Sequence, residues 1–234
     1  GDEVICPAIN YKASQLAILG HGGKVVFCDI NPKTLNIEPE DVKKRITEHT
    51  RAILPVHMNG LPAPIDDLLS IAQQHSHPRH GPIKIIGDAA RACGARFKDA
   101  RVGSKAWITT FSFQSKKLMT TLGEGGMITT NDNEVAEKIY KIRNFGGEDD
   151  WGSNYKMTKV QAAVGIVQLS RLDEMNSLRI KAANRRSEIL KDIPELSLPC
   201  SPADAEHLHY TYSILLRNDF AGLKRDMIIS IMKK

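Results

Sequence analysis

The stretch FSFQSKKLMTTLGEGG, residues 111–126, combines the end of an apolar strand, a polar turn, two lysines and a glycine-rich segment. A lysine near a strand end can form an imine with a carbonyl cofactor when its neighbours lower its pKa. The glycines on either side of Glu124 let the backbone bend tightly and approach a ligand closely. By itself the stretch also fits a solvated Lys116-Lys117 pair before a glycine turn, so a cofactor site needs a second signal.

The segment IIGDAARACG, residues 85–94, supplies a carboxylate at the end of another apolar run. The small residues after Asp88 leave room for a flat ring. A carboxylate that faces a pyridine nitrogen keeps that nitrogen protonated, so that the ring can accept electrons. The alternative is that Asp88 only caps the helix that follows.

Short apolar runs alternate with helical patterns along most of the chain. This alternation predicts an α/β fold with a parallel or mixed sheet that helices cover on both faces. In such sheets ligands bind at the carboxyl ends of the strands, which is where Asp88 and Ser112 fall. We expect strands at 4–7, 24–28, 51–56, 83–87, 107–113 and 127–130, and helices at 11–19, 39–47, 65–74, 134–143 and 158–175.

The composition changes near residue 187, where several prolines follow within a short span. Beyond them the pattern predicts a strand at 210–216 and a helix at 221–232. We therefore expect a large domain over residues 1–186 and the beginning of a small C-terminal α+β domain over residues 187–234. The chain opens directly before an apolar run and ends inside a helical pattern, so we expect both domains to be incomplete, the large one lacking its N-terminal part.

The composition also excludes several classes of protein. Hydrophobic residues make up 41% of the chain and charged residues 25%, which is typical of a globular protein. No run approaches the ~20 apolar residues of a membrane helix, and the net charge of +5 is too diffuse to indicate nucleic acid. The four cysteines lack metal-ligand spacing, so we expect reduced thiols, no metal site and a cytoplasmic location.

Together the motifs resemble those of the DegT/DnrJ/StrS family of sugar aminotransferases that depend on pyridoxal 5'-phosphate (PLP). The resemblance implies a type I PLP-dependent transferase fold, like that of aspartate aminotransferase, with a mixed, mostly parallel sheet. Several motifs in register are far more specific than a single one. The resemblance runs to about residue 172 and rests on GDEVI at 1–5, FCDI at 27–30, LPVHMNG at 54–60, DAA at 88–90, SFQ-x-x-K at 112–117, GEGG at 123–126 and NYKMT-x-VQAA at 154–163.

The resemblance assigns roles to individual residues. Lys117 would hold PLP as a Schiff base, and Asp88 would pair with the pyridinium nitrogen. Ser112 would bind the cofactor phosphate, and Tyr11 would lie against the face of the ring. Asn154 would reach the phosphate from a partner subunit, which implies a homodimer with composite active sites; the alternative for Asn154 is a loop residue or a helix cap.

Three positions depart from the family pattern. Arg91 replaces a frequent Gln or His near the phenolic oxygen of the cofactor, where its fixed charge would favour the phenolate. Cys93 and Gln114 each stand where His is common. His57 occupies a position similar to that in the family, but a single His beside apolar residues is more often structural.

The activity implied by the resemblance is transfer of an amino group from glutamate or glutamine to a keto sugar, usually nucleotide-linked in relatives, in amino-sugar or surface-polysaccharide biosynthesis. Lys117, once released from the cofactor, would be the general base for the proton transfer. The alternatives are an aminotransferase of a cyclitol or other non-nucleotide ketone, and a non-catalytic sensor or structural protein that keeps the fold. A PLP-dependent sugar dehydratase is disfavoured, because relatives of that kind replace the lysine with His.

Overall fold

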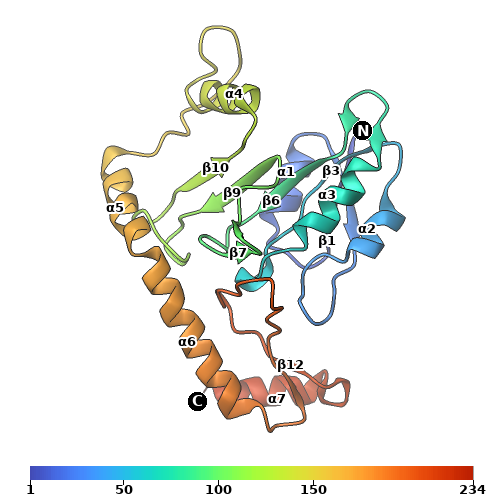
Figure 1. The fold of residues 1–234 in the computed structure, drawn as a ribbon, viewed down its shortest axis with the longest axis vertical. Coiled ribbons are helices and arrows are strands. Elements are labelled where there is room, and N and C mark those ends of the chain that lie inside the picture. The colour runs from blue at the N-terminus through green and yellow to red at the C-terminus, as the bar shows by residue number, and fades with distance from the viewer. Residues whose placement is uncertain (234) are drawn as a thin grey trace.

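A computed structural model describes residues 1–233 of the chain. Its centre is a six-stranded sheet in the order β10-β9-β6-β3-β1-β2 (Figure 1). Neighbouring strands pair in parallel from β2 to β9, and β10 pairs antiparallel with β9. The strands are β1 (Glu3–Pro7), β2 (Lys24–Cys28), β3 (Thr50–Ile53), β6 (Lys84–Asp88), β9 (Ile108–Ser112) and β10 (Gly126–Thr129).

Helices cover both faces of this sheet because successive strand residues point to opposite sides. Ile5 and Ile53 pack in one cluster with Leu68 of α3 (Ile65–Gln73), and α2 (Pro39–Arg45) adds a buried valine to it. On the other face Cys6 packs with Ile18 of α1 (Ala13–Gly20). Figure 1 shows α1 and α3 on opposite sides of the strands. The predicted α/β fold class is therefore confirmed.

The second half of the chain extends away from the sheet (Figure 1). The helices here are α4 (Asn133–Arg143), α5 (Lys159–Ser170) and α6 (Leu172–Leu190). The long helix α6 starts beside the sheet, where Leu172 is buried, and leads to the C-terminal elements. These elements are β11 (Leu196–Ser197), β12 (Leu215–Leu216), the short helix η2 (Asn218–Phe220) and α7 (Leu223–Met232).

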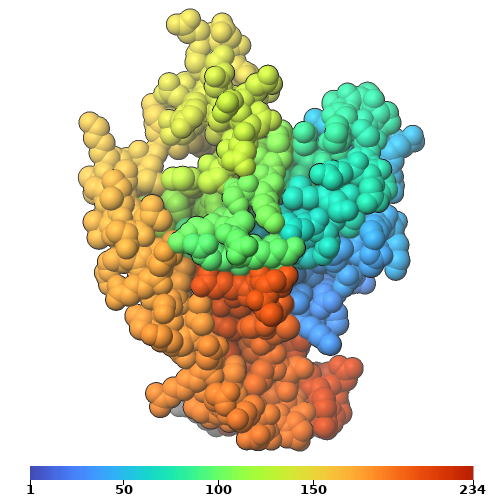
Figure 2. Space-filling view, in the orientation of Figure 1, coloured from blue at the N-terminus to red at the C-terminus, as the bar shows by residue number. Residues whose placement is uncertain are grey.

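The chain between β11 and β12 returns to the large part of the molecule. Figure 2 shows this segment, in orange-red, seated directly against the green surface that follows β6. Backbone hydrogen bonds fix the contact: Lys98 N donates to Asp204 O (2.6 Å), and Glu206 N donates to Arg96 O (2.8 Å). The receiving surface is the small hairpin of β7 (Arg96–Phe97) and β8 (Ala100–Arg101).

Two predicted elements differ from the structure. The single helix expected at 158–175 is divided at Arg171, which ends α5 and begins α6, because the turn there directs Leu172 into the core. The strand expected at 210–216 is reduced to β12, because the backbone bends at Tyr210 and Thr211 and only Leu215 and Leu216 pair with β11. Helix α6 also runs across position 187 as far as Leu190, and the division into domains at this position stays a prediction.

Among residues 1–233, no helix combines the length and the apolar composition needed to cross a membrane. The remaining short elements are η1 (Met58–Gly60) and the hairpin of β4 (Ser76–His77) and β5 (Gly81–Pro82).

Candidate active site

The carboxylate of Asp88 is held at the carboxyl end of β6 by hydrogen bonds to both of its oxygens. Ser14 Oγ at the start of α1 donates to Oδ2 (2.9 Å), and the backbone N–H of Ala90 donates to Oδ1 (3.0 Å). The backbone of Asp88 is fixed as well, because its N–H donates to Pro55 O (2.9 Å) and its carbonyl accepts from His57 N (3.0 Å). The carboxylate is therefore oriented before any ligand arrives.

The amine of Lys117 lies near this carboxylate and is partly buried. Burial lowers the pKa of Lys117, and the nearby positive charge of Arg91 lowers that pKa further, while the carboxylates of Asp88 and Glu124 oppose the shift. A lysine with a lowered pKa is more often neutral, and only a neutral amine is a nucleophile. The structure thus brings together Lys117, Asp88 and Arg91, three of the residues named as site candidates.

The segment between β9 and β10 forms a hydrogen-bonded loop that presents Lys117. The N–H of Phe113 donates to Gly125 O (2.8 Å), and the N–H of Ser115 donates to Gly123 O (2.8 Å). Gly123 has φ +121°, a conformation that residues with a side chain rarely adopt. The expectation that glycines shape this turn is therefore confirmed.

Arg91 follows β6 by three residues and lies between Lys117 and the loop after β3. Its Nη1 donates to Met58 Sδ (2.8 Å). Because a guanidinium stays charged, it fixes a positive charge beside Lys117 at any physiological pH. The family resemblance implied a place for Arg91 near the cofactor, whereas its contact with Met58 could not be read from the sequence.

Ser112 and Tyr11 lie at the same edge of the sheet. Ser112 is the last residue of β9, and its Oγ accepts a long hydrogen bond from Gln114 N (3.4 Å). Tyr11 lies in the loop from β1 to α1, with its side chain 64% exposed. Parallel strands end at one edge of a sheet, so the loops after β1, β6 and β9 converge there.

Asn154 lies apart from this group. It is exposed in the segment between α4 and α5, where it forms an isolated bridge with Asn144. Figure 1 shows that segment extending from the end of α4 toward α5, away from β6. Within residues 1–233, no side-chain hydrogen bond joins Asn154 to the other site residues, so its role across a subunit interface stays a prediction.

Two residues near the reactive groups were not foreseen from the sequence. Ser14 binds the Asp88 carboxylate, and the ring of Tyr210 lies 5.4 Å from Lys117 Nζ. A serine in the first turn of a helix that follows β1 is a usable signal, because that turn lies at the ligand-binding edge. No sequence signal marks Tyr210, since it lies 93 positions after Lys117.

His57 is fully buried beside the site and is neutral. Burial lowers the pKa of His57 to about 4, although the negative charge of Asp88 acts in the opposite direction. Nδ1 of His57 accepts a hydrogen bond from the backbone N–H of Ala63 (3.0 Å). The side chain thus fixes the loop after β3, which agrees with the structural role expected from the sequence.

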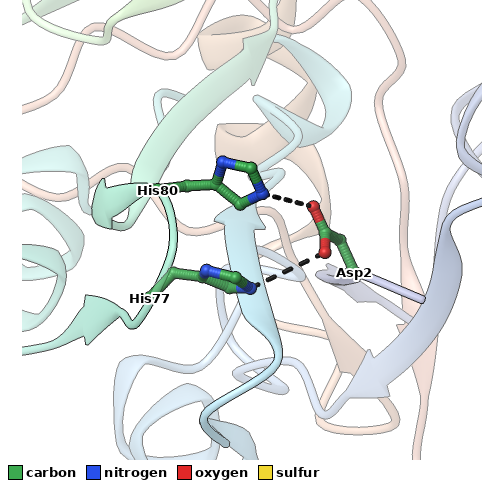
Figure 3. Close-up of side chains that lie close together, drawn as sticks. All are labelled: Asp2, His77 and His80. Carbon is green, nitrogen blue, oxygen red and sulfur yellow. Dashed lines mark ion pairs between the residues drawn. The ribbon is translucent and has the colours of Figure 1, made fainter.

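A second cluster of ionisable groups lies at the amino end of β1, where Asp2 meets His77 and His80 (Figure 3). Each histidine Nε2 lies 3.6 Å from an oxygen of Asp2, and the Arg79 guanidinium lies 3.5 Å from the same carboxylate. The backbone N–H of Arg79 donates to His77 Nδ1 (3.1 Å), so Nε2 carries the ring proton and points at Asp2 as a donor. A metal would need the lone pair of that nitrogen. Because burial lowers the pKa of His77, its ring faces Asp2 as a neutral donor, and Arg79 supplies the lasting positive charge beside this carboxylate.

Comparisons with known proteins agree with this geometry. A model of the DegT/DnrJ/EryC1/StrS aminotransferase family matches residues 1–234. The GDP-perosamine synthase of Caulobacter vibrioides is 35% identical over 98% of this chain, and the L-glutamine:2-deoxy-scyllo-inosose aminotransferase of Streptomyces lividus is 34% identical over 92% of it. The chain spans 62% and 53% of the length of these two relatives.

The fold is also that of solved structures. The crystal structure of DesV of S. venezuelae, in complex with a ketimine intermediate, superposes with a TM-score of 0.91 at 32% identity. The match covers 99% of this chain and 61% of DesV. The chain therefore belongs to the DegT/DnrJ/EryC1/StrS aminotransferase family, whose aminotransferases depend on PLP.

Proposed function

We propose that this protein is a PLP-dependent aminotransferase that moves an amino group from an amino acid to a keto sugar. One observation carries the proposal: an amine with a lowered pKa, on Lys117, shares one edge of the sheet with the oriented carboxylate of Asp88. A reactive amine and a fixed negative charge are the two groups that hold a pyridine aldehyde at opposite ends.

The residues present fit PLP. Lys117 supplies the amine for the covalent link, and Asp88 supplies the acceptor for the ring N–H. Two buried polar atoms near these residues have no hydrogen-bond partner within residues 1–233, namely Asn10 Nδ2 before α1 and Thr120 Oγ1 three residues after Lys117. Buried polar atoms without a partner are costly in a protein alone and are satisfied when a polar ligand binds.

Each protein group has a defined task in this proposal. PLP, when bound, supplies an electron sink next to the reacting carbon. Asp88 keeps the ring nitrogen protonated, because Ser14 and the Ala90 N–H hold its carboxylate in place. Lys117 carries the proton between carbon atoms as a general base, which its lowered pKa makes possible. Ser112 donates to the phosphate.

Two further cofactor contacts belong to the proposal. The aromatic ring of Tyr11 lies against the cofactor face. Arg91 is the donor to the phenolic oxygen, and its permanent charge also keeps a second positive charge close to Lys117. Both assignments rest on the family resemblance together with the position of these residues at the edge where β1 and β6 end.

The proposed substrates are a keto sugar, nucleotide-linked, and glutamate or glutamine as the amino donor. The sequence likeness to a GDP-perosamine synthase supports a nucleotide-linked sugar. The second candidate is an aminotransferase of a cyclitol with glutamine as donor, which the nearly equal identity to the S. lividus enzyme supports. A side-by-side assay of a keto sugar nucleotide and a keto cyclitol distinguishes the two.

The proposed assembly is a homodimer in which Asn154 reaches the cofactor phosphate of the partner subunit. Its exposed position, away from Lys117 of its own chain, supports such a role. We also propose a cytoplasmic location, because all four cysteines are free and none is paired.

Borohydride trapping tests the function. The full-length protein, loaded with PLP and reduced with borohydride, is expected to carry the pyridoxyl label on the peptide that contains Lys117. Lys117→Ala should abolish the label, whereas Lys116→Ala, the matched control one residue away, should keep it. Label on Lys116, or on neither lysine, would contradict the assignment and favour a non-catalytic protein that keeps the fold.

A further inference from the structure

The aromatic ring of Tyr210 covers the amine of Lys117. The distance from Lys117 Nζ to the ring centroid is 5.4 Å, within the ~6 Å over which a cation is attracted to an aromatic face. Tyr210 is half-buried and packs against the apolar cluster that contains Leu118 and Met119, the two residues after Lys117. Ring and lysine therefore belong to one packed unit.

Other groups do not fix this amine. Within residues 1–233, Lys117 Nζ makes no side-chain hydrogen bond and no ion pair within 4 Å. The charged groups that face it at longer range are Arg91, which repels it, and Asp88 and Glu124, which attract it. The ring of Tyr210, 5.4 Å from Lys117 Nζ, thus offers the amine a directional contact that these charges do not.

A specific backbone contact brings Tyr210 to this place. The N–H of Leu208 donates to Gly60 O (3.1 Å). Gly60 has φ +89°, and a Cβ there would lie 3.0 Å from Arg91 O and 3.2 Å from Tyr210 N. Only glycine lets the loop after β3, the loop after β6 and the returning C-terminal segment approach so closely.

The contact also connects two parts of the chain. Tyr210 lies on the segment between β11 and β12, whereas Lys117 lies on the loop after β9. The same segment is anchored at Arg96 and Lys98 of the large part. Any movement of this segment therefore moves the ring over the amine.

We propose that Tyr210 is a positioning residue whose ring face holds the amine of Lys117, so that docking of the C-terminal segment on Gly60 sets the orientation and charge of that amine. The inference rests on the proposed function, because the amine that Tyr210 holds is the one that would bind PLP. Tyr210 itself acts only through Lys117.

The test measures the protonation of Lys117 without turnover. The full-length protein, freed of PLP, is labelled with acetic anhydride at a series of pH values, and mass spectrometry follows the Lys117 peptide. Tyr210→Leu keeps an apolar side chain but removes the ring, so the cation loses a stabilising partner. Loss of a cation–π contact worth about 1 kcal/mol should lower the measured pKa of Lys117 by about 0.7 in this variant. Tyr210→Phe keeps the ring face and should leave that pKa unchanged.

Two controls separate this effect from general loss of structure. Tyr212→Leu removes a neighbouring tyrosine that is stacked by Arg186 (4.9 Å) and should leave the pKa of Lys117 unchanged. If Tyr210→Leu fails to fold, 4-cyanophenylalanine at position 210 keeps the shape of the ring while it withdraws electron density, and the pKa should again fall. An unchanged or raised pKa in either variant would overturn the proposal. Borohydride trapping on Lys117 in wild-type protein is independent of this result and reports separately on the proposed function.

Discussion

At the scale of single residues, the Asp88 carboxylate is held in one orientation before any ligand binds. One oxygen accepts from a hydroxyl of α1 and the other from a backbone N–H, and each bond holds the carboxylate in one orientation. Within residues 1–233 no helix directly follows Asp88, because the chain turns after Ala90 and leads to β7, so the helix cap expected as the alternative from the sequence is wrong. The bond from Ala90 N instead closes a turn on the Asp88 side chain. The turn uses Oδ1 and the bond from Ser14 uses Oδ2, so both oxygens of the carboxylate are held.

This arrangement gives a prediction for Asp88 and Ser14. Asp88→Asn removes the charge that holds a ring proton, and loss of a charged hydrogen bond of about 3 kcal/mol corresponds to a kcat lower by roughly a hundredfold. Ser14→Ala removes only a hydroxyl that orients the carboxylate. A loss of about 1.4 kcal/mol of transition-state stabilisation lowers kcat by roughly tenfold. Steady-state kinetics of the PLP-loaded protein measures both effects.

The control for these variants is Asp99→Asn, an exposed carboxylate in the turn between β7 and β8. Its kcat should equal that of the wild type. Normal turnover in Asp88→Asn, together with a loss of thermal stability, would mean that the residue serves only to hold the turn after β6.

At the scale of elements, helix α5 supports the loop that carries Lys117. Thr158 and Gln161 form a capping box, in which Thr158 Oγ1 accepts from Gln161 N (3.3 Å) and Gln161 Oε1 accepts from Thr158 N (3.1 Å). The same glutamine side chain donates through Nε2 to the backbone oxygen of Glu124 (2.9 Å). The helix start and the glycine-rich turn are therefore one hydrogen-bonded unit.

We expect Thr158→Ala to lower the free energy of unfolding by about 1 kcal/mol, because one helical N–H loses its partner and the glutamine loses its fixed position. Urea denaturation measures this change. Thr158→Ser retains the hydroxyl and should remain within a few tenths of a kcal/mol of wild type. Because Thr158 is exposed, a change in core packing does not contribute to the change in the free energy of unfolding. Equal losses of stability in Thr158→Ala and Thr158→Ser would contradict the role of the cap.

At the scale of the whole molecule, a large apolar area remains uncovered on α5. Val160, Ile166, Val167 and Leu169 are each more than half exposed. Exposed apolar areas of this extent mark surfaces that contact another protein or another part of the same one. A dimer of the proposed kind would supply such a cover and would bring Asn154 to a neighbouring site.

Subunit mixing tests this assembly. Lys117→Ala and Asn154→Ala should each be inactive as homodimers of the full-length protein. Refolded together in equal amounts, they should recover about one quarter of the wild-type activity, because half of randomly paired dimers contain one intact composite site of two. Mixing two batches of Lys117→Ala is the control and should recover none. Full activity of Asn154→Ala alone, or of a monomer, would refute the composite site.

The sequence by itself determined the class of fold, and it predicted the strands that carry the candidate site and two charged groups of that site. Alternating apolar runs specify buried strands, and motifs of local chemistry such as DAA and SFQ-x-x-K lie within one strand end each. Asp88 and Lys117 could therefore be named as candidates, through the family resemblance of these motifs, before the strands were placed side by side. The break at Arg171 was missed, because helical periodicity continues through it and only the burial of Leu172 requires the turn.

Tertiary structure alone decided which distant residues reach these groups. Ser14 meets Asp88 across 74 positions of sequence, and Tyr210 meets Lys117 because Gly60 permits three backbone segments to approach. Such contacts depend on crossover geometry and on close packing, which no local pattern encodes. The lowered pKa of Lys117 has the same origin, since burial and the charge of Arg91 arise only when the loops after β6 and β9 converge at one edge of the sheet.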